Sequence, residues 1–145
     1  MKINYLSSSK TYFTSTSYFV MRFTIGAMMC YYHGWEKLMD DIDRWYQLGT
    51  SLTRWIGVDA LAVPLGFMAA FAESIAALFI ALGLLTRPMA FLMAFTMLVA
   101  SSKKLSQAGI DGSEMPLLYL VLSLVILLNG SGKYSLDYLF FRNRK

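Results

Sequence analysis

The chain has 145 residues, of which 57% are hydrophobic and only 15% are charged, and its mean hydropathy is +0.49. So little charge, with the apolar residues gathered in long blocks, is rare in a soluble domain and typical of an integral membrane protein with a single domain over residues 1–145. The net charge of +4 does not indicate nucleic-acid binding, because the basic residues lie at the ends of the apolar blocks, and a single cysteine excludes a disulfide within the chain.

The first apolar block predicts a transmembrane helix over residues 17–38. Residues 1–16 are largely polar, and the block contains Arg22 and no small-residue cleavage site. We therefore expect it to be retained as a helix instead of being removed as a signal peptide. Arg22, His33 and Lys37 follow helical spacing with Gly26 and Met29 between them, so they share one face of this helix.

Residues 43–57 predict a short amphipathic helix on the outer surface of the membrane. Apolar residues recur there at helical spacing, with polar residues between them. Tryptophan side chains favour the level of the lipid headgroups, so Trp35, Trp45 and Trp55 are expected to be interfacial anchors. The simplest role for the segment is an anchor or a lid without chemistry of its own.

The second apolar block predicts a transmembrane helix over residues 61–85, with Glu73 near its middle and long uncharged stretches on both sides. A carboxylate at that depth is costly, so it needs a partner, a proton or a function. Two interpretations stay open. Glu73 either forms a structural ion pair with Arg22 or Lys37, or it carries a proton or binds a ligand in an internal cavity.

Glu73 shares its helix face with small residues, which let helix backbones approach closely in lipid. These small residues are Gly66, Ala69, Ala70, Ala76 and Ala77. We expect this face to pack against the polar face of the first helix, with the carboxylate within reach of Arg22, His33 or Lys37.

Two further spans are predicted over residues 88–105 and 115–128. The break at residues 86–88 suits a helix start, because proline is tolerated at the first helical position. Residues 111–113 are interpreted as a turn, with Ser113 as the N-cap of the last helix. The fold class is therefore an all-α bundle of four transmembrane helices with a short outer interfacial helix.

The distribution of charge predicts the orientation. Seven of the nine acidic residues fall on the side of the connections between the first two spans and between the last two, whereas most basic residues fall on the other side. By the positive-inside rule, both termini are expected to be cytoplasmic, in a bacterial inner membrane.

A buried polar network is the candidate site, with the members Arg22, His33, Lys37, Glu73 and Glu114. His33 is interpreted either as a hydrogen-bonded residue near the outer interface or as a proton relay or quinone-head contact. We expect His33 or Lys37 to approach Glu114 beneath residues 43–57. The pattern assigns no catalytic residue, predicts no metal site and offers no nucleotide fold for a soluble redox cofactor held by this chain alone.

The order of several motifs resembles the DoxX family of small four-helix membrane proteins. The motifs are Arg22 and Gly26 with His33-Gly34-x-x-Lys37; Pro64 with Ala72-Glu73-x-x-Ala76; residues 82–87; Glu114 before Leu117-Leu118-Tyr119; and a C-terminal signature that includes Gly130, Gly132, Ser135 and Asp137. The chain departs from the family pattern at residues 102–104, where many members have a histidine, and at Ser131, where proline is usual.

The resemblance implies a function only in outline. Some members are linked to membrane oxidoreductases, including subunits of thiosulfate:quinone oxidoreductase. The leading hypothesis is an accessory or anchoring subunit of an inner-membrane redox complex, with a quinone or other lipophilic ligand near Glu73 and His33. The alternative is a non-enzymatic assembly factor, scaffold or transporter-like subunit. In either case the expected partners are the bilayer and other membrane subunits or further copies of the chain.

Overall fold

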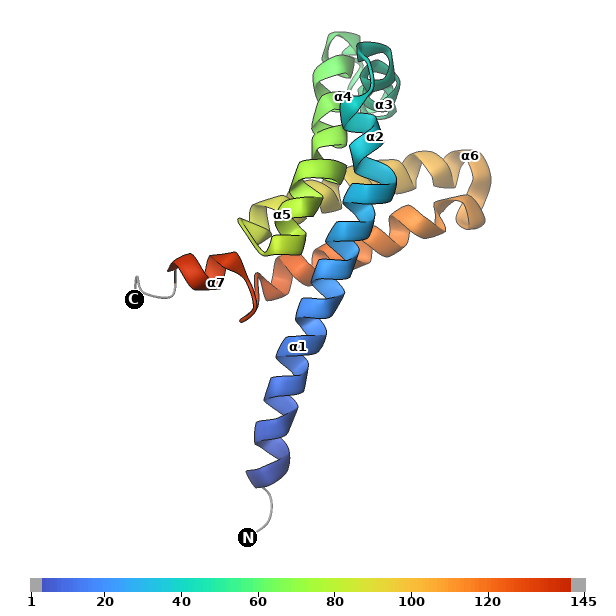
Figure 1. The fold of residues 1–145 in the computed structure, drawn as a ribbon. Helices are drawn as coiled ribbons and strands as arrows, with labels where there is room; N and C mark the ends of the chain where they lie inside the picture. Colours follow the sequence, from blue (N-terminus) through green and yellow to red (C-terminus); the bar gives the residue numbers. More distant parts are fainter. Residues whose placement is uncertain (1–3, 142–145) are drawn as a thin grey trace.

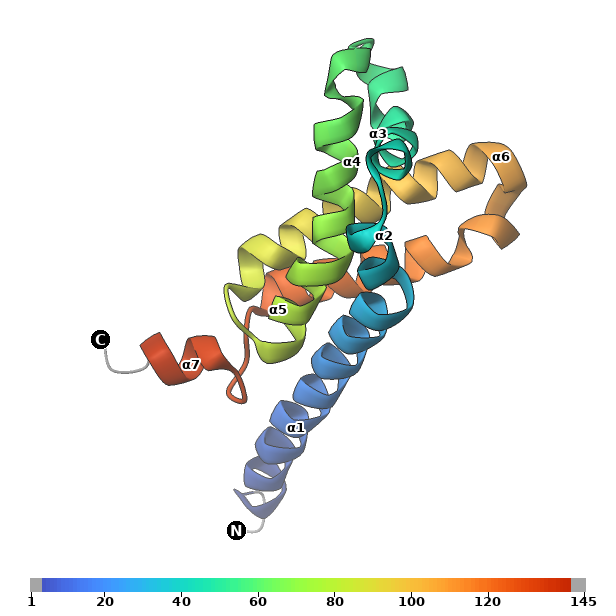
Figure 2. The same cartoon turned by 45° about the horizontal axis from the view of Figure 1, so that its top comes forward.

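The structure, a computed structural model, describes the backbone of residues 4–141 and the side chains of residues 14–140. Within that range every regular element is helical, so the predicted all-α fold is confirmed. Figures 1 and 2 show a long N-terminal helix, a helical pair that rises from its far end, and a bent helix that crosses both.

The first helix is longer than predicted and contains an irregular turn. It runs as α1 (Asn4–Met29), the π-helical turn η1 (Cys30–Gly34) and α2 (Trp35–Met39). The residues before the apolar block therefore extend the helix instead of preceding it. A π turn holds one residue more than an α turn, so it shifts the side chains beyond it around the axis.

The amphipathic segment forms α3 (Ile42–Ile56), close to the predicted bounds. The side chain of Asp41 caps its start by accepting a hydrogen bond from the backbone N–H of Arg44 at 3.1 Å. Gly57 ends it in the left-handed region, at a φ of 73°. The chain then turns back through η2 (Asp59–Leu61).

The second apolar helix comprises α4 (Ala62–Phe71), a second π turn η3 (Ala72–Ala76) and α5 (Ala77–Leu82). It lies antiparallel to α3, and two glycines set the distance between them. A Cβ at Gly49 would lie 1.7 Å from the carbonyl oxygen of Ala62, and one at Gly66 would lie 1.7 Å from that of Trp45. The two helices therefore pack backbone against backbone (Figure 2).

Residues predicted as the third and fourth spans form the two arms of α6 (Thr86–Asn129). The bend between them is at Gly109, with φ 70° and ψ −161°, and not at residues 111–113. The prediction of Ser113 as an N-cap is wrong, because its hydroxyl donates back to the carbonyls of Gly109 and Ile110 at 3.1 and 3.0 Å. Only glycine readily adopts the positive φ of Gly109, so the backbone turns at that residue. A short helix, α7 (Leu136–Phe141), follows.

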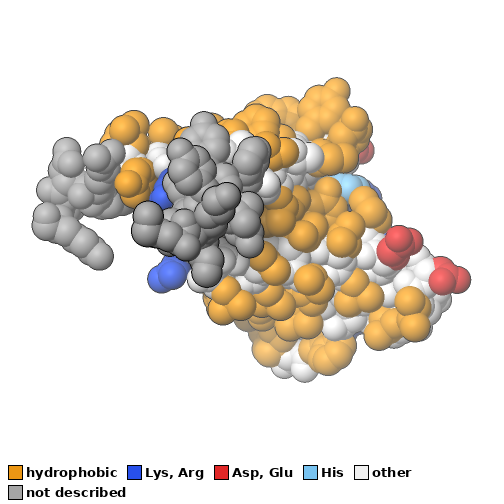
Figure 3. All heavy atoms as spheres, turned by 90° about the horizontal axis from the view of Figure 1, so that it is seen from below, with side chains coloured by type: hydrophobic (Ala, Val, Ile, Leu, Met, Phe, Trp, Pro, Cys, Tyr) orange, Lys and Arg blue, Asp and Glu red, His pale blue; other side chains and the backbone are white. Residues whose placement is uncertain are grey.

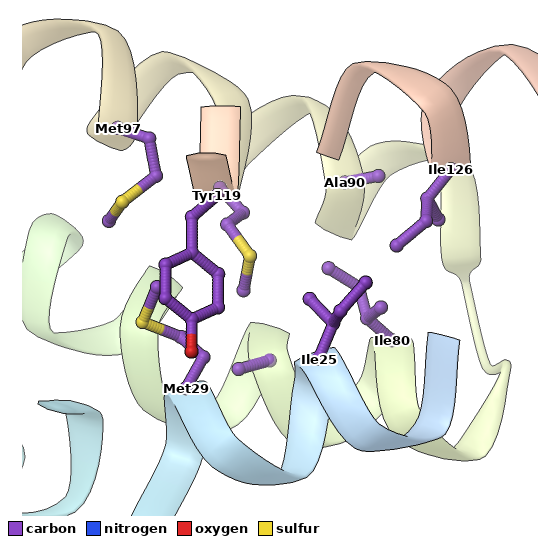
Figure 4. Close-up of a cluster of buried hydrophobic side chains, with 9 residues drawn as sticks. Ile25, Met29, Ile80, Ala90, Met97, Tyr119 and Ile126 are labelled. Carbon is purple, nitrogen blue, oxygen red and sulfur yellow. The ribbon is translucent and has the colours of Figure 1, made fainter. Parts of the chain in front are cut away.

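The core lies where α1, α5 and both arms of α6 meet. Figure 4 shows Ile25 close to Ile80, and Tyr119 beside Met29. The buried cluster consists of Ile25, Met29, Ala77, Ile80, Ala90, Met93, Met97, Tyr119 and Ile126. A Cβ added at Gly26 would lie 2.5 Å from the carbonyl oxygen of Ala77. The small-residue face of the second apolar helix therefore packs on the first helix here, as predicted.

The surface is largely apolar, and the face in Figure 3 carries few charged side chains. Within the described residues, two helical stretches are long and apolar enough to cross a membrane, Asp59–Leu82 and Thr86–Asn129. The second contains two predicted spans, joined at Gly109.

Candidate functional site

The two π turns meet at the centre of the molecule. A Cβ at Gly34, in η1, would lie 2.1 Å from the carbonyl oxygen of Glu73, in η3. Only a glycine allows the two backbones to approach so closely. Because π turns re-aim the side chains around them, they occur often at functional sites. Here they bring the end of the first helix against the middle of the second.

Glu73 forms an ion pair with Lys37 across this contact. Glu73 is buried, with its side chain 6% exposed, whereas the Lys37 side chain is 22% exposed. Of the three partners expected for the carboxylate, the structure therefore selects Lys37. The indole N–H of Trp45 donates to the carbonyl oxygen of Lys37 at 2.9 Å, which ties α3 to the same place.

Arg22, the other candidate for an ion pair with Glu73, does not pair with it. Its side chain is fully buried and donates to the carbonyl oxygens of Ile80, Ala81 and Tyr134, the last two at 2.9 and 2.8 Å. The last carbonyls of a helix have no partner within it and carry partial negative charge. Arg22 therefore closes the C-terminal end of α5, because the two helices run antiparallel and place it there.

Residues 130–137, which contain the C-terminal signature, lie over the end of α5 and the start of α6. We call this segment the C-terminal clasp. One carboxylate oxygen of Asp137 accepts from the backbone N–H of Leu85 at 2.8 Å, and the other from the N–H and hydroxyl of Thr86 at 3.0 and 2.9 Å. Asp137 thus caps α6. The hydroxyl of Tyr18 donates to the carbonyl oxygen of Gly130 at 2.6 Å and joins the clasp to α1.

The other clasp residues of the signature have local roles. The hydroxyl of Ser135 donates to the carbonyl oxygen of Gly132 at 2.8 Å and accepts from the backbone N–H of Tyr138 at 3.1 Å. Gly130 and Gly132 have φ values of 78° and 74°, which favour glycine. The signature therefore fixes the geometry of the chain between α6 and α7.

His33 does not contact Glu114, although His33 or Lys37 was expected to approach it. His33 is half-buried, with its ring edge-to-face to Tyr119 at 6.1 Å, and both line a small cavity of about 90 Å³ with Lys37 and Glu73. Glu114 is exposed, and among the described residues it forms no hydrogen bond or ion pair. The prediction that Glu114 belongs to a buried network is therefore wrong. Ser113 is buried, so the side chain of the next residue, Glu114, points outward.

A larger cavity, of about 460 Å³, also adjoins the ion pair. Its walls come from α3, α4 and the first arm of α6, and we call it the main cavity. It is lined by Lys37, Leu48, Gly49, Ser51, Leu52, Leu65, Met68, Ala69, Glu73, Leu92, Phe95, Thr96, Val99, Ala100, Lys103, Lys104 and Gln107. The walls are mostly apolar, and the charged groups are three lysines and Glu73.

Two of these lysines, at the predicted end of the third span, are not among the expected site residues. Lys103 donates from α6 to the hydroxyl of Ser51 on α3 at 2.8 Å, and Lys104 lines both cavities. The available signal is helical spacing, since Lys103 is four residues after Val99 and Lys104 is four after Ala100, and residues four apart share a face. Both lysines fall at the end of the span predicted over residues 88–105.

The predicted tryptophan anchors divide into two kinds. Trp35 and Trp55 are exposed, and Trp55 is 75% exposed. Trp45 is half-buried and packs edge-to-face on Phe67 at 5.0 Å, so its assignment as an anchor is corrected to a contact between α3 and α4. Its ring belongs to the apolar face of α3, which α4 covers.

The family comparison covers the part of the chain that holds this site. The DoxX family model matches residues 17–102, more than half of the 145 residues. This match includes Arg22, His33, Lys37 and Glu73. No curated protein and no solved structure gives a significant match. The chain therefore belongs to the DoxX family, and its apolar helices mark it as a membrane protein.

Proposed function

We propose that this protein is an accessory, anchoring subunit of a membrane redox complex and that it holds a quinone-like lipophile in the main cavity. The observation that carries the proposal is the cavity itself, in which apolar walls adjoin the Lys37–Glu73 pair. Ligand sites are commonly clefts of about 300–1,000 Å³ that are mainly apolar with a few placed polar groups.

The residues of the main cavity fit such a ligand. The ring of Phe95 and the side chains of Leu65 and Met68 offer apolar contact to a ring and its tail. Lys37 and Lys104 offer N–H donors to carbonyl oxygens, and Glu73 offers an acceptor to a hydroxyl. A quinone, when bound, would supply the electron chemistry, while these residues would bind and orient it.

The proposed role is accessory because the chain has one cysteine and one histidine, a poor donor set for a redox metal. Electrons would reach the ligand from a partner subunit. The exposed apolar side chains on both arms of α6, such as Phe91 and Val121, suit lipid or the helices of that partner.

A second candidate, a non-enzymatic scaffold or assembly factor, has its own supporting observation. Arg22 and Asp137 are two of the polar residues that match the family pattern. Arg22 donates to backbone carbonyls at the end of α5, and Asp137 accepts from backbone N–H groups at the start of α6. Such contacts stabilise a fold without chemistry. A bound lipophile distinguishes the two candidates.

Topology is the first test. We propose a bacterial inner-membrane protein with four spans and cytoplasmic termini, supported by the bias of acidic residues to one side. In a Cys30→Ala background, an impermeant thiol reagent should label Gln47→Cys from the periplasm and should leave Ser7→Cys and Asn143→Cys unlabelled until the membrane is opened. Periplasmic labelling of either terminal position would reverse the orientation.

Ligand retention is the second test. Ala69→Leu adds bulk inside the main cavity, and Ala108→Leu makes the same change at an exposed position outside it. Native purification followed by mass spectrometry should find quinone and a redox subunit with the wild type and Ala108→Leu, and about tenfold less quinone with Ala69→Leu. Equal quinone in both variants would place the lipophile elsewhere. A well-folded wild type without quinone or redox subunit would favour the scaffold.

A further inference from the structure

The main cavity has more positive than negative charge on its lining. Lys37 is paired with Glu73, but Lys103 donates to a neutral hydroxyl, that of Ser51, and within the described residues no carboxylate pairs with Lys103 or Lys104. Two ammonium groups thus adjoin an apolar space without a protein counter-charge. Lys103 is half-buried and Lys104 is exposed, so both ammonium groups are free to take an anionic partner at the edge of this space.

The two lysines lie together at one end of the face that α6 presents to the main cavity. Along the cavity-facing side of α6 the residues change from apolar, at Leu92, Phe95 and Val99, to basic, at Lys103 and Lys104. Leu92, Phe95, Val99 and Lys103 are three or four apart, so they follow one another along a single stripe, and Lys104 is four residues after Ala100 in the same lining. The lining therefore has an apolar stretch that leads to a basic stretch.

The volume of the cavity limits the size of the apolar part of a ligand. The 460 Å³ of the main cavity lies within the range of about 300–1,000 Å³ that is usual for small-ligand sites, which suits a ligand with one hydrocarbon chain.

We infer that the main cavity binds a single-chain amphiphile with an anionic head, a carboxylate or a phosphate, whose head contacts Lys103 and Lys104. This goes beyond the proposed quinone ligand, and it rests on the proposed function only for the identity of the cavity as a lipophile site. The ammonium groups donate charge-assisted hydrogen bonds to the head. The chain of the amphiphile lies along Leu92, Phe95 and Val99.

The test compares matched probes on the purified full chain in nanodiscs of neutral phosphatidylcholine. The probes share a sixteen-carbon chain: palmitate and palmitoyl lysophosphatidate are anionic, and hexadecanol is neutral. Measured by native mass spectrometry at pH 8, the anionic probes should bind about tenfold more tightly than hexadecanol. The better of the two anions identifies the head as carboxylate or phosphate.

Substitutions locate the effect. Lys103→Gln and Lys104→Gln, singly and together, should remove the preference for anions and leave hexadecanol binding unchanged. Lys133→Gln, an exposed lysine outside the cavity, is the matched control and should change nothing. Equal binding of all probes to the wild type would overturn the inference and leave the lipophile cavity intact.

Other outcomes separate the two proposals. If the anions keep their advantage in the double variant, or if Ala69→Leu does not weaken them, they bind at the bilayer surface and the inference is wrong. If no probe binds but quinone still co-purifies, the inference fails and the proposed function stands. If quinone is absent and the anions bind as expected, the proposed function fails as to quinone, while the cavity remains a lipophile site.

Discussion

Replacing Lys37 with methionine is expected to destabilise the protein by about 3 kcal/mol, because it leaves the carboxylate of Glu73 buried without a counter-charge. The Glu73 side chain is 6% exposed, so its carboxylate would keep little contact with water once Lys37 is removed. Glu73→Gln should cost less. Lys37 is 22% exposed, so its ammonium can turn toward water or the cavity.

Thermal unfolding in detergent, with membrane abundance as a second measure, tests this order. The double variant Lys37→Met/Glu73→Gln should recover most of the stability lost in Lys37→Met, since neither charge is then left alone. Asp40→Asn is the control, because the Arg44–Asp40 pair is exposed and long, at 3.7 Å, and such pairs contribute little. A stable Lys37→Met would mean that the pair does not hold the helices together.

Replacing Arg22 with methionine should have the other large effect, a loss of more than about 3 kcal/mol, because hydrogen bonds to a charged group contribute about 1.5–3 kcal/mol each. Methionine fills much of the same space but leaves the carbonyls of Ile80, Ala81 and Tyr134 without their donor. The end of α5 and the C-terminal clasp should separate together.

Arg22→Lys distinguishes charge from geometry. A lysine keeps the positive charge at the helix end but lacks the fork of donors that reaches three carbonyls, so its stability should fall between those of the wild type and Arg22→Met. Thermal unfolding gives the order, and protease sensitivity after Gly132 reports whether the clasp has opened. If Arg22→Met unfolds at the wild-type temperature, the guanidinium is not what closes α5.

The sequence predicted the features that depend on local pattern. The apolar blocks gave the helices, and the small residues around Ala77 predicted the close packing on the first helix. The cost of an isolated carboxylate led to the expectation of a cation beside Glu73. These inferences depend on hydrophobicity and helical spacing, which are properties of short stretches of chain.

The features that could not be predicted depend on backbone departures from the regular helix. Spacing counted at 3.6 residues per turn does not register the two π turns, which meet where Gly34 lies against Glu73 beside Lys37. Arg22, in contrast, lies further along the helix, beside Ile80 and Ala81. The turn at Gly109 was missed because residues 111–113 contain stronger turn formers. The role of Asp137 depends on a contact with Leu85 and Thr86 more than fifty residues away.

The C-terminal clasp has a consequence for the way the chain is assembled at the ribosome. Arg22 and Tyr134 are 112 residues apart, so the guanidinium is synthesised long before its last acceptor. In the interval the helix end at Ile80 and Ala81 can already accept from Arg22, while the start of α6 lacks the carboxylate of Asp137. Contacts of such separation form late. A chain interrupted before the clasp would therefore leave the backbone N–H groups at the start of α6 without their carboxylate cap.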